Sequence, residues 1–359
     1  MSGDRAERLA ALVGERDLDA LLVTDLMNLR WASGFTGTAG LALVGPAARV
    51  FMTDFRYVER AADEVDGYEQ RRAPQGELAE SVLALLPEER PLRIGFDDAH
   101  VPVKLWRKVV EKLPEGVELV DAAGIVEELR AVKDAGEIER IRAAAQLADA
   151  AFRAIIEPGI AGRTERSVAL ALEDEMRRLG AEGPSFPSIV AAGAHGALPH
   201  AEPRDAEILE ETLVVVDFGA KLDGYCSDCT RTVATGEIAE DAREVYELVL
   251  RAQLAALDAV RPDIVGRDVD AIARTIIADA GHGERFGHGL GHGVGLEVHE
   301  APRLAKSGTT PLVAGNVVTC EPGVYVPGNV GVRIEDLLVV THDGAERISS
   351  LEKDLAVVG

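Results

Sequence analysis

Four acidic residues occupy corresponding places in two predicted β-hairpins in the second half of the chain. Asp217 ends the apolar run of the first hairpin and Asp228 lies on its return strand, while Glu321 and Glu335 hold the same places in the second. Symmetric pairing about a turn at 221–224 predicts that the two aspartates face each other, and the second hairpin predicts the same for the two glutamates. Opposed like charges on buried strands are destabilising. Four convergent carboxylates therefore indicate a binuclear site for divalent cations.

A glycine-rich segment beside these hairpins carries three histidines. Residues 286–300 read FGHGLGHGVGLEVHE, with His288, His292 and His299 and a glycine at every second position from 287 to 295. So much glycine disfavours a helix and predicts an extended segment that other backbone and ligands can approach closely. The segment fits neither G-x-G-x-x-G nor H-E-x-x-H. Imidazole near carboxylates indicates that it supplies at least one metal ligand.

The three cysteines do not form a redox or zinc motif. Cys226 and Cys229 have C-x-x-C spacing on a predicted strand rather than at a strand-to-helix turn, and only Cys320 remains. Three cysteines are too few for a disulfide framework. We expect buried structural thiols in a protein of the reducing cytoplasm.

An internal repeat positions the two hairpins. A helix predicted over 134–157 begins with a capping box formed by Asp134 and Glu137, and a second helix follows over 164–179, with Thr164 as its N-cap. The linking motif P-x-I-x-G-R at 158–163 recurs 104 residues later, the same offset that separates the first acids of the two hairpins. The sequence thus predicts an α+β C-terminal domain, residues 134–359, built from two related halves.

The sequence of the first part of the chain predicts a separate α/β domain over residues 1–125. We expect the boundary with the C-terminal domain in the segment 121–133. Helical patterns alternate there with apolar strands at 20–23, 41–44, 50–53, 94–96 and 117–120. The 359 residues include 62 Asp and Glu against 38 Lys and Arg, a net charge of −24, which argues against nucleic-acid binding. No apolar stretch is long enough to span a membrane, and the N-terminus lacks the apolar core of a signal peptide.

The motifs together resemble the pita-bread-fold metallopeptidases, in the branch of the Xaa-Pro dipeptidases (prolidases) and aminopeptidase P. The matching motifs are Leu198-Pro199-His200, Val216-Asp217-Phe218-Gly219-Ala220, Ser227-Asp228-Cys229-Thr230-Arg231-Thr232, His288-Gly-Leu-Gly-His292, Val298-His299-Glu300, Cys320-Glu321-Pro322-Gly323 and Gly331-Val332-Arg333-Ile334-Glu335-Asp336. Residues 34–37 and 53–57 resemble the creatinase-like N-terminal domain of that branch. Methionine aminopeptidases lack this domain, and creatinase does not keep the full set of ligands.

The resemblance implies roles for individual residues. The metal ligands would be Asp217, Asp228, His292, Glu321 and Glu335, holding two divalent ions, with Mn²⁺ favoured and Co²⁺ or Zn²⁺ as alternatives. Glu321 would be the general base, and His299 would stabilise the oxyanion or guide the leaving nitrogen. His200 and His288 would line the substrate pocket, and Arg333 would bind a substrate carboxylate. The repeat offset from His299 would select His195 instead, but we prefer the Leu-Pro-His match at His200.

The implied activity is hydrolysis of the bond before proline by a hydroxide that bridges the two metals. A prolidase acting on Xaa-Pro dipeptides is the preferred interpretation, and an aminopeptidase P acting on longer peptides is the alternative. A binding module that has lost turnover and a non-peptidase hydrolase or lyase on the same fold stay open. The resemblance also implies a homodimer.

Overall fold

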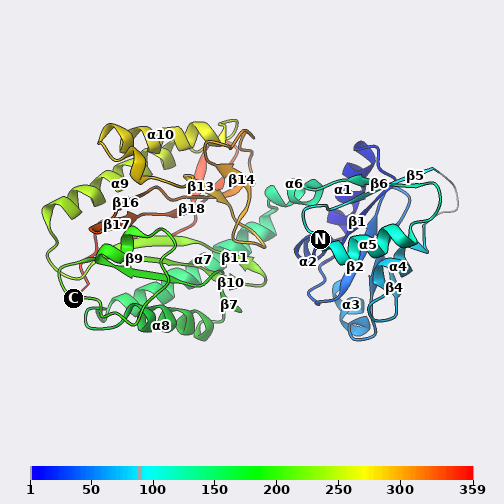
Figure 1. Ribbon diagram of the computed structural model, residues 1–359, viewed down its shortest axis with the longest axis horizontal. Helices are drawn as coiled ribbons and strands as arrows, with labels where there is room; N and C mark the ends of the chain where they lie inside the picture. Colours follow the sequence, from blue (N-terminus) through cyan, green and yellow to red (C-terminus); the bar gives the residue numbers. More distant parts are fainter. Residues whose placement is uncertain (1, 87–90, 359) are drawn as a thin grey trace. The chain divides into compact units, whose positions relative to one another are not determined.

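The computed structural model describes residues 2–86 and 91–358, and the chain divides into two compact units, Met1–Arg130 and Ala131–Gly359 (Figure 1). The division falls after Arg130, within the segment 121–133 that was expected to hold the boundary and five residues beyond the expected end of the first domain. Helix α6 (Ile125–Ala131) accounts for this difference. Its Ile125 and Val126 are buried, and Arg130 donates to Asn28 of the first unit at 2.7 Å.

The first unit is built on a six-stranded mixed sheet with the order β4-β3-β2-β1-β5-β6. Its strands are β1 (Ala20–Val23), β2 (Gly40–Val44), β3 (Arg49–Thr53), β4 (Glu69–Arg72), β5 (Leu92–Phe96) and β6 (Val117–Asp121). Its helices are α1 (Ser2–Glu15), α2 (Leu26–Ser33), α3 (Val58–Glu64), α4 (Leu78–Leu83), α5 (Val103–Lys112) and α6. The strands predicted at 20–23, 41–44, 50–53, 94–96 and 117–120 are all present, and the central β1 is buried along its whole length.

The second unit contains two long helix pairs and short sheets. Its helices are α7 (Ala135–Ile156), α8 (Glu165–Arg178), α9 (Glu240–Ala259) and α10 (Gly266–Asp279), with single turns η1 (Gly193–Ala197) and η2 (Gly283–Arg285). Its strands are β7 (Gly183–Pro184), β8 (Ile189–Ala192), β9 (Leu213–Phe218), β10 (Ala220–Leu222), β11 (Tyr225–Cys226), β12 (Cys229–Ala234), β13 (Gly291–Gly293), β14 (Glu300–Leu304), β15 (Val317–Cys320), β16 (Gly323–Val326), β17 (Val330–Arg333), β18 (Asp336–Val340) and β19 (Ala345–Arg347). None of the described helices combines the length and apolarity needed to cross a bilayer.

The helix caps expected from the sequence form as predicted. The Asp134 side chain accepts from the Glu137 amide and the Glu137 side chain accepts from the Asp134 amide, which completes the capping box of α7. Thr164 caps α8 by accepting from the Ser167 amide. Such caps satisfy amide groups that have no partner within the helix.

Each helix pair packs on the strands of its own half. The α7–α8 pair shares an apolar core with β8, β9 and β12, in which Phe152 of α7 stacks on Phe218 of β9 with ring centroids 5.0 Å apart. The α9–α10 pair shares a second core with β14, β15, β17 and β18. Figure 1 shows the two pairs on opposite sides of the strands, so the strands form a middle layer between them. This arrangement is the two-fold repeat that the sequence predicted.

The register expected for the first hairpin is wrong. Asp217 pairs with Thr230, not with Asp228, and Leu222 pairs with Tyr225 across a two-residue turn. The turn residues Asp223 and Gly224 have φ angles of 49° and 81°, the left-handed conformation typical of a tight Asp-Gly hairpin. The sequence interpretation counted Lys221 and Leu222 as turn residues, although they belong to β10, and this placed the centre of the hairpin one residue too early.

The second hairpin has the expected register about Gly328. Val326 pairs with Val330, and farther from the turn Cys320 pairs with Asp336. Glu321 and Glu335 are the next residues inward from this last pair and therefore stand opposite each other.

Candidate metal centre

The predicted ligands come from five different chain segments that meet between the two halves of the second unit. Asp217 lies near the end of β9, Asp228 precedes β12, Glu321 follows β15, Glu335 precedes β18 and His292 is the middle residue of β13. Oxygen atoms of Asp217, Asp228 and Glu335 all lie within 4.8 Å of one another. The structure thus brings one acid of the second hairpin against both acids of the first.

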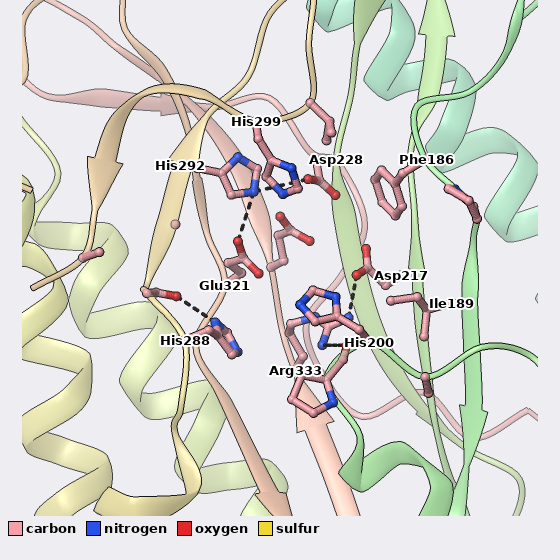
Figure 2. A pocket seen from close by; sticks show the side chains of 18 of the residues that line it. Phe186, Ile189, His200, Asp217, Asp228, His288, His292, His299, Glu321 and Arg333 are labelled. Atoms are coloured by element: carbon pink, nitrogen blue, oxygen red, sulfur yellow. Dashed lines mark hydrogen bonds and ion pairs between the residues drawn. The ribbon is translucent and has the colours of Figure 1, made fainter. Parts of the chain in front are cut away.

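Glu321 and His292 complete this group from the opposite side. His292 Nε2 lies 3.2 Å from Glu321 Oε1 and 3.6 Å from Asp228 Oδ2 (Figure 2). Its other ring nitrogen, Nδ1, is 3.0 Å from the carbonyl oxygen of Gly293. Donation from Nδ1 to that carbonyl turns Nε2 toward the acids, as expected for an imidazole that binds a metal through Nε2.

Two buried oxygen atoms of the cluster have no hydrogen-bond partner among the described residues. They are Asp217 Oδ1 and Glu335 Oε1. Leaving buried carboxylate oxygens without a partner is costly, and divalent cations would bind both. The donor set is rich in carboxylates and has one imidazole, which suits divalent cations. The residues present therefore fit the divalent ions implied by the sequence.

The electrostatics also favour positive charge at this place. Burial, together with the charge of neighbouring acids, raises the pKa of Asp217 and raises the pKa of Asp228 and Glu335 well above their usual range. Burial alone would raise the pKa of Glu321, but the hydrogen bond with His292 and nearby cationic groups lower it. Burial would lower the pKa of His292, yet Glu321 raises it.

Arg333 has other partners than the substrate carboxylate expected for it. Its Nη2 donates to Asp217 Oδ2 and its Nε donates to Thr230 Oγ1 at 3.1 Å. Its Nη1 donates to the Pro199 carbonyl at 3.1 Å and to the Tyr325 hydroxyl at 2.8 Å. All three nitrogens of this buried guanidinium are engaged. Arg333 is therefore placed to neutralise Asp217 rather than to offer two free donors to a ligand.

The remaining predicted histidines line one cavity of about 600 Å³ together with the acids. His288 Nε2 lies 2.8 Å from the Tyr325 hydroxyl, and burial lowers the pKa of His288. The ring of His299 stands edge-on to that of His292, with centroids 4.4 Å apart. His200 lines the cavity as expected. His195, the residue selected by the repeat offset, instead lies beside Glu165, with Nδ1 and Oε2 2.9 Å apart.

Glycine in the histidine segment permits close packing of main chains. A Cβ atom on Gly291 would lie 2.1 Å from the carbonyl oxygen of Thr319, and one on Gly293 would lie 2.1 Å from that of Ala301. No side chain fits there, so β13 can lie against its neighbours only because these residues are glycines. The extended conformation predicted for this segment is observed between Gly291 and Gly293.

Several cavity residues were missed by the sequence interpretation. Apolar side chains of Phe186, Ile189 and Val298 and polar side chains of Glu202, Arg303 and Ser307 line the cavity. Arg303 pairs with His292 across β13 and β14, so a prediction of that strand pair would have found it. Phe186 lies in a connecting segment with no motif, and no sequence signal marks it.

Comparison with known proteins agrees with this geometry. The model of metallopeptidase family M24 matches residues 139–342, and the creatinase/prolidase N-terminal domain matches residues 5–132. The Xaa-Pro dipeptidase of Pyrococcus horikoshii is 36% identical over 98% of both chains. Solved structures of an Xaa-Pro dipeptidase from Bacillus anthracis and an X-Pro aminopeptidase from Thermotoga maritima are 40% and 35% identical, with TM-scores of 0.93 and 0.89. Both alignments cover 99% of this chain and 100% of the other. This chain belongs to metallopeptidase family M24.

Proposed function

We propose that the protein is an Xaa-Pro dipeptidase that uses two divalent ions, with Mn²⁺ as the preferred metal. The observation that carries the proposal is the buried carboxylate cluster with two unpartnered oxygens, Asp217 Oδ1 and Glu335 Oε1, lining a cavity large enough for a dipeptide. The similarity to named Xaa-Pro dipeptidases along the whole chain supports the choice of substrate.

The chain supplies both metal binding and proton transfer. Asp217, Asp228, His292, Glu321 and Glu335 would hold the ions, which when bound lower the pKa of water and polarise a carbonyl group. Glu321 lies in the cavity wall, where its carboxylate can take a proton from the attacking water and return it to the proline nitrogen as the bond breaks.

The histidines would act on the substrate. His299, beside His292, can donate a hydrogen bond to the oxygen of the scissile carbonyl as negative charge develops there. Burial lowers the pKa of His288, and its Nδ1 and Nε2 lie within hydrogen-bond distance of the Gly289 carbonyl and the Tyr325 hydroxyl. We infer that His288 and His200 shape the wall that receives the substrate, while Glu321 and His299 carry the proton and charge changes.

Arg303 supports a preference for dipeptides. It lines the cavity from β14 with an exposed side chain, and no hydrogen bond or ion pair within residues 2–86 and 91–358 engages its guanidinium. Its donors can therefore bind the terminal carboxylate of a substrate in a bidentate manner. In an Xaa-Pro dipeptide that carboxylate belongs to the proline next to the scissile bond, whereas in a longer peptide an uncharged amide stands there.

The decisive experiment compares Ala-Pro, Ala-Pro-Ala and Ala-Ala as substrates of the Mn²⁺-loaded protein. We expect Ala-Pro to be cleaved fastest and Ala-Ala not at all. Arg303→Gln should lower the rate on Ala-Pro while leaving that on Ala-Pro-Ala nearly unchanged. Faster cleavage of Ala-Pro-Ala by the wild type would favour the aminopeptidase alternative, which the Thermotoga maritima structure also supports.

We further propose that the protein is cytoplasmic and forms a homodimer. Cys226, Cys229 and Cys320 are free and buried, which supports a reducing cytoplasm. A homodimer is proposed from the family resemblance, and a light-scattering mass near that of one chain, 38.2 kDa, would refute it.

A further inference from the structure

A paired acid and arginine on α10 face the main chain of the histidine segment. Asp270, which is 1% exposed, accepts from Arg274 Nε at Oδ2 and from Arg274 Nη2 at Oδ1, both at 2.8 Å. The two residues are one helical turn apart, so they meet on one face of α10. Two parallel hydrogen bonds fix the orientation of the guanidinium as well as its position.

The other hydrogen bonds of Asp270 and Arg274 join them to the main chain of the segment that carries His288. Arg274 Nη1 donates to the Phe286 carbonyl and Nη2 to the His288 carbonyl, both at 2.8 Å. Asp270 Oδ1 also accepts from the Leu290 amide at 3.0 Å. The guanidinium lies over the Phe286 ring, 4.2 Å from its centroid. Three alternate residues of the segment are therefore bound to one ion pair.

The segment needs such support because of its composition. Residues 287, 289, 291 and 293 are glycines, which restrict the backbone less than any other residue. The only described hydrogen bonds of the His288 ring are to its neighbour Gly289 and to the hydroxyl of Tyr325. The carbonyl of His288 is thus a fixed point from which the ring reaches into the cavity.

The other half of the repeat has a counterpart on α8. Glu165, in the first turn of that helix, accepts from the amides of Ala192 and Arg204, both at 3.0 Å. The Arg204 side chain also donates to it, at 3.1 Å from Nε and 3.0 Å from Nη2. Glu165 thus closes the segment 192–204, which carries His200. In each half, a buried acid on the second helix holds the loop that brings a histidine to the cavity.

We propose that Asp270 and Arg274 form a positioning pair for His288, and that Glu165 with Arg204 does the same for His200. Neither pair lines the cavity, so each acts through the loop that it holds. The effect on turnover rests on the proposed peptidase function, whereas the effect on the loop does not.

The test uses Arg274→Met in the full-length, Mn²⁺-loaded protein, with Arg267→Met as the matched control. Arg267 lies on the same helix, and its side chain is exposed and 3.7 Å from Asp268. Hydrogen–deuterium exchange should show faster exchange of peptides spanning 286–290 in the Arg274 variant only. Its kcat/KM on Ala-Pro should fall by about tenfold to a hundredfold, the loss expected when a substrate-contacting group moves by about 1 Å.

A double-mutant cycle separates positioning from general structural support. In a His288→Ala background, Arg274→Met should change kcat/KM by less than about twofold, because the residue through which it acts is gone. An equal loss of kcat/KM in both backgrounds, or unchanged exchange of 286–290, would overturn the proposal.

Arg274→Lys provides a milder variant. One ammonium cannot reproduce the guanidinium's bonds to Asp270 and both carbonyls, so we expect a kcat/KM between those of the wild type and Arg274→Met. If the wild type cleaves no Xaa-Pro peptide, the proposed function fails but the exchange result still decides the positioning role.

Discussion

The two halves of the second unit, α7 to β12 and α9 to β18, follow one plan but divide the chemistry unequally. Each contains two helices, a loop with a cavity histidine and a hairpin with two acids. The first half supplies Asp217, Asp228 and His200. The second supplies Glu321 and Glu335, together with the three histidines of the glycine-rich segment. The second half has the close-packed glycine strand β13, whereas the corresponding strand of the first, β8, reads IVAA.

The hairpins show how one plan accommodates two registers. The two-residue turn of the first places Thr230 opposite Asp217, and Thr230 Oγ1 donates to Glu335 Oε2 at 2.8 Å. A hydroxyl thus stands where symmetric pairing would have placed a second carboxylate, which avoids a direct like-charge pair. It also links the first hairpin to an acid of the second. The difference between the two registers shows that the acids are brought together by contacts between the two halves as much as by strand pairing within each half.

The strongest test of this comparison removes one acid from each half. Asp228→Asn and Glu335→Gln should each lower kcat/KM on Ala-Pro by roughly a thousandfold, because a lost metal ligand removes several kcal/mol of transition-state stabilisation. Metal content, measured by mass spectrometry, should fall in both. Asp223→Asn, in the turn of the first hairpin, is the control and should keep its metal content and its activity. A variant that retained its metal and activity would show that the halves do not share the site.

The close packing of β13 can be broken at a single glycine. Gly291→Ala should lower the free energy of unfolding by about 1–3 kcal/mol, because its Cβ would overlap the Thr319 backbone and the strands must separate. Since the neighbouring His292 moves with them, activity should fall as well. Gly287→Ala is the matched control, because no atom of the described residues other than its chain neighbours would lie within 4 Å of its Cβ. Similar losses in both variants, measured by urea unfolding, would contradict the packing explanation.

Local signals in the sequence predicted much of this arrangement. The caps at Asp134 and Thr164 depend only on neighbouring residues, and the register of the second hairpin follows from its turn. The first hairpin could not be placed correctly, because an Asp-Gly pair fits either as the centre of a two-residue turn or as the end of a longer one. The partners of Arg333 and the position of Phe186 depend on segments far apart in the chain, so no local pattern marks them.

The support for the first half has a defined pH dependence. Burial alone would raise the pKa of Glu165, but hydrogen bonds from Arg204, the Ala192 amide and His195 hold it below its usual 4.5. Ionised Glu165 therefore stabilises the fold above its unfolded-state pKa, and this contribution is lost as pH falls through the folded-state pKa. Glu165→Gln should lower the free energy of unfolding at pH 7 by roughly 2 kcal/mol. At acidic pH, the free energies of unfolding of Glu165→Gln and the wild type should differ by less.

Glu210→Gln controls for this measurement, because Glu210 is exposed. Urea unfolding of the wild type and both variants at pH 7 and below pH 4 would show whether the stabilisation by Glu165 depends on its charge. A Glu165→Gln deficit that stayed constant with pH would mean that the charge of Glu165 is not what holds segment 192–204.

The smallest effect concerns the turn of the second hairpin. Gly328 has a φ angle of 75°. Within residues 2–86 and 91–358, no atom other than those of its chain neighbours lies within 4 Å of its Cβ position, so Gly328→Ala adds no clash but places a side chain in the left-handed region. That conformation costs roughly 1 kcal/mol for a residue with a Cβ. Gly344→Ala is the control, because it has equal space and no positive φ; it should be neutral or slightly stabilising. Both should keep full activity, since the paired strands and not the turn hold Glu321 opposite Glu335. A loss of activity in Gly328→Ala alone would show instead that the turn sets the register of the acids.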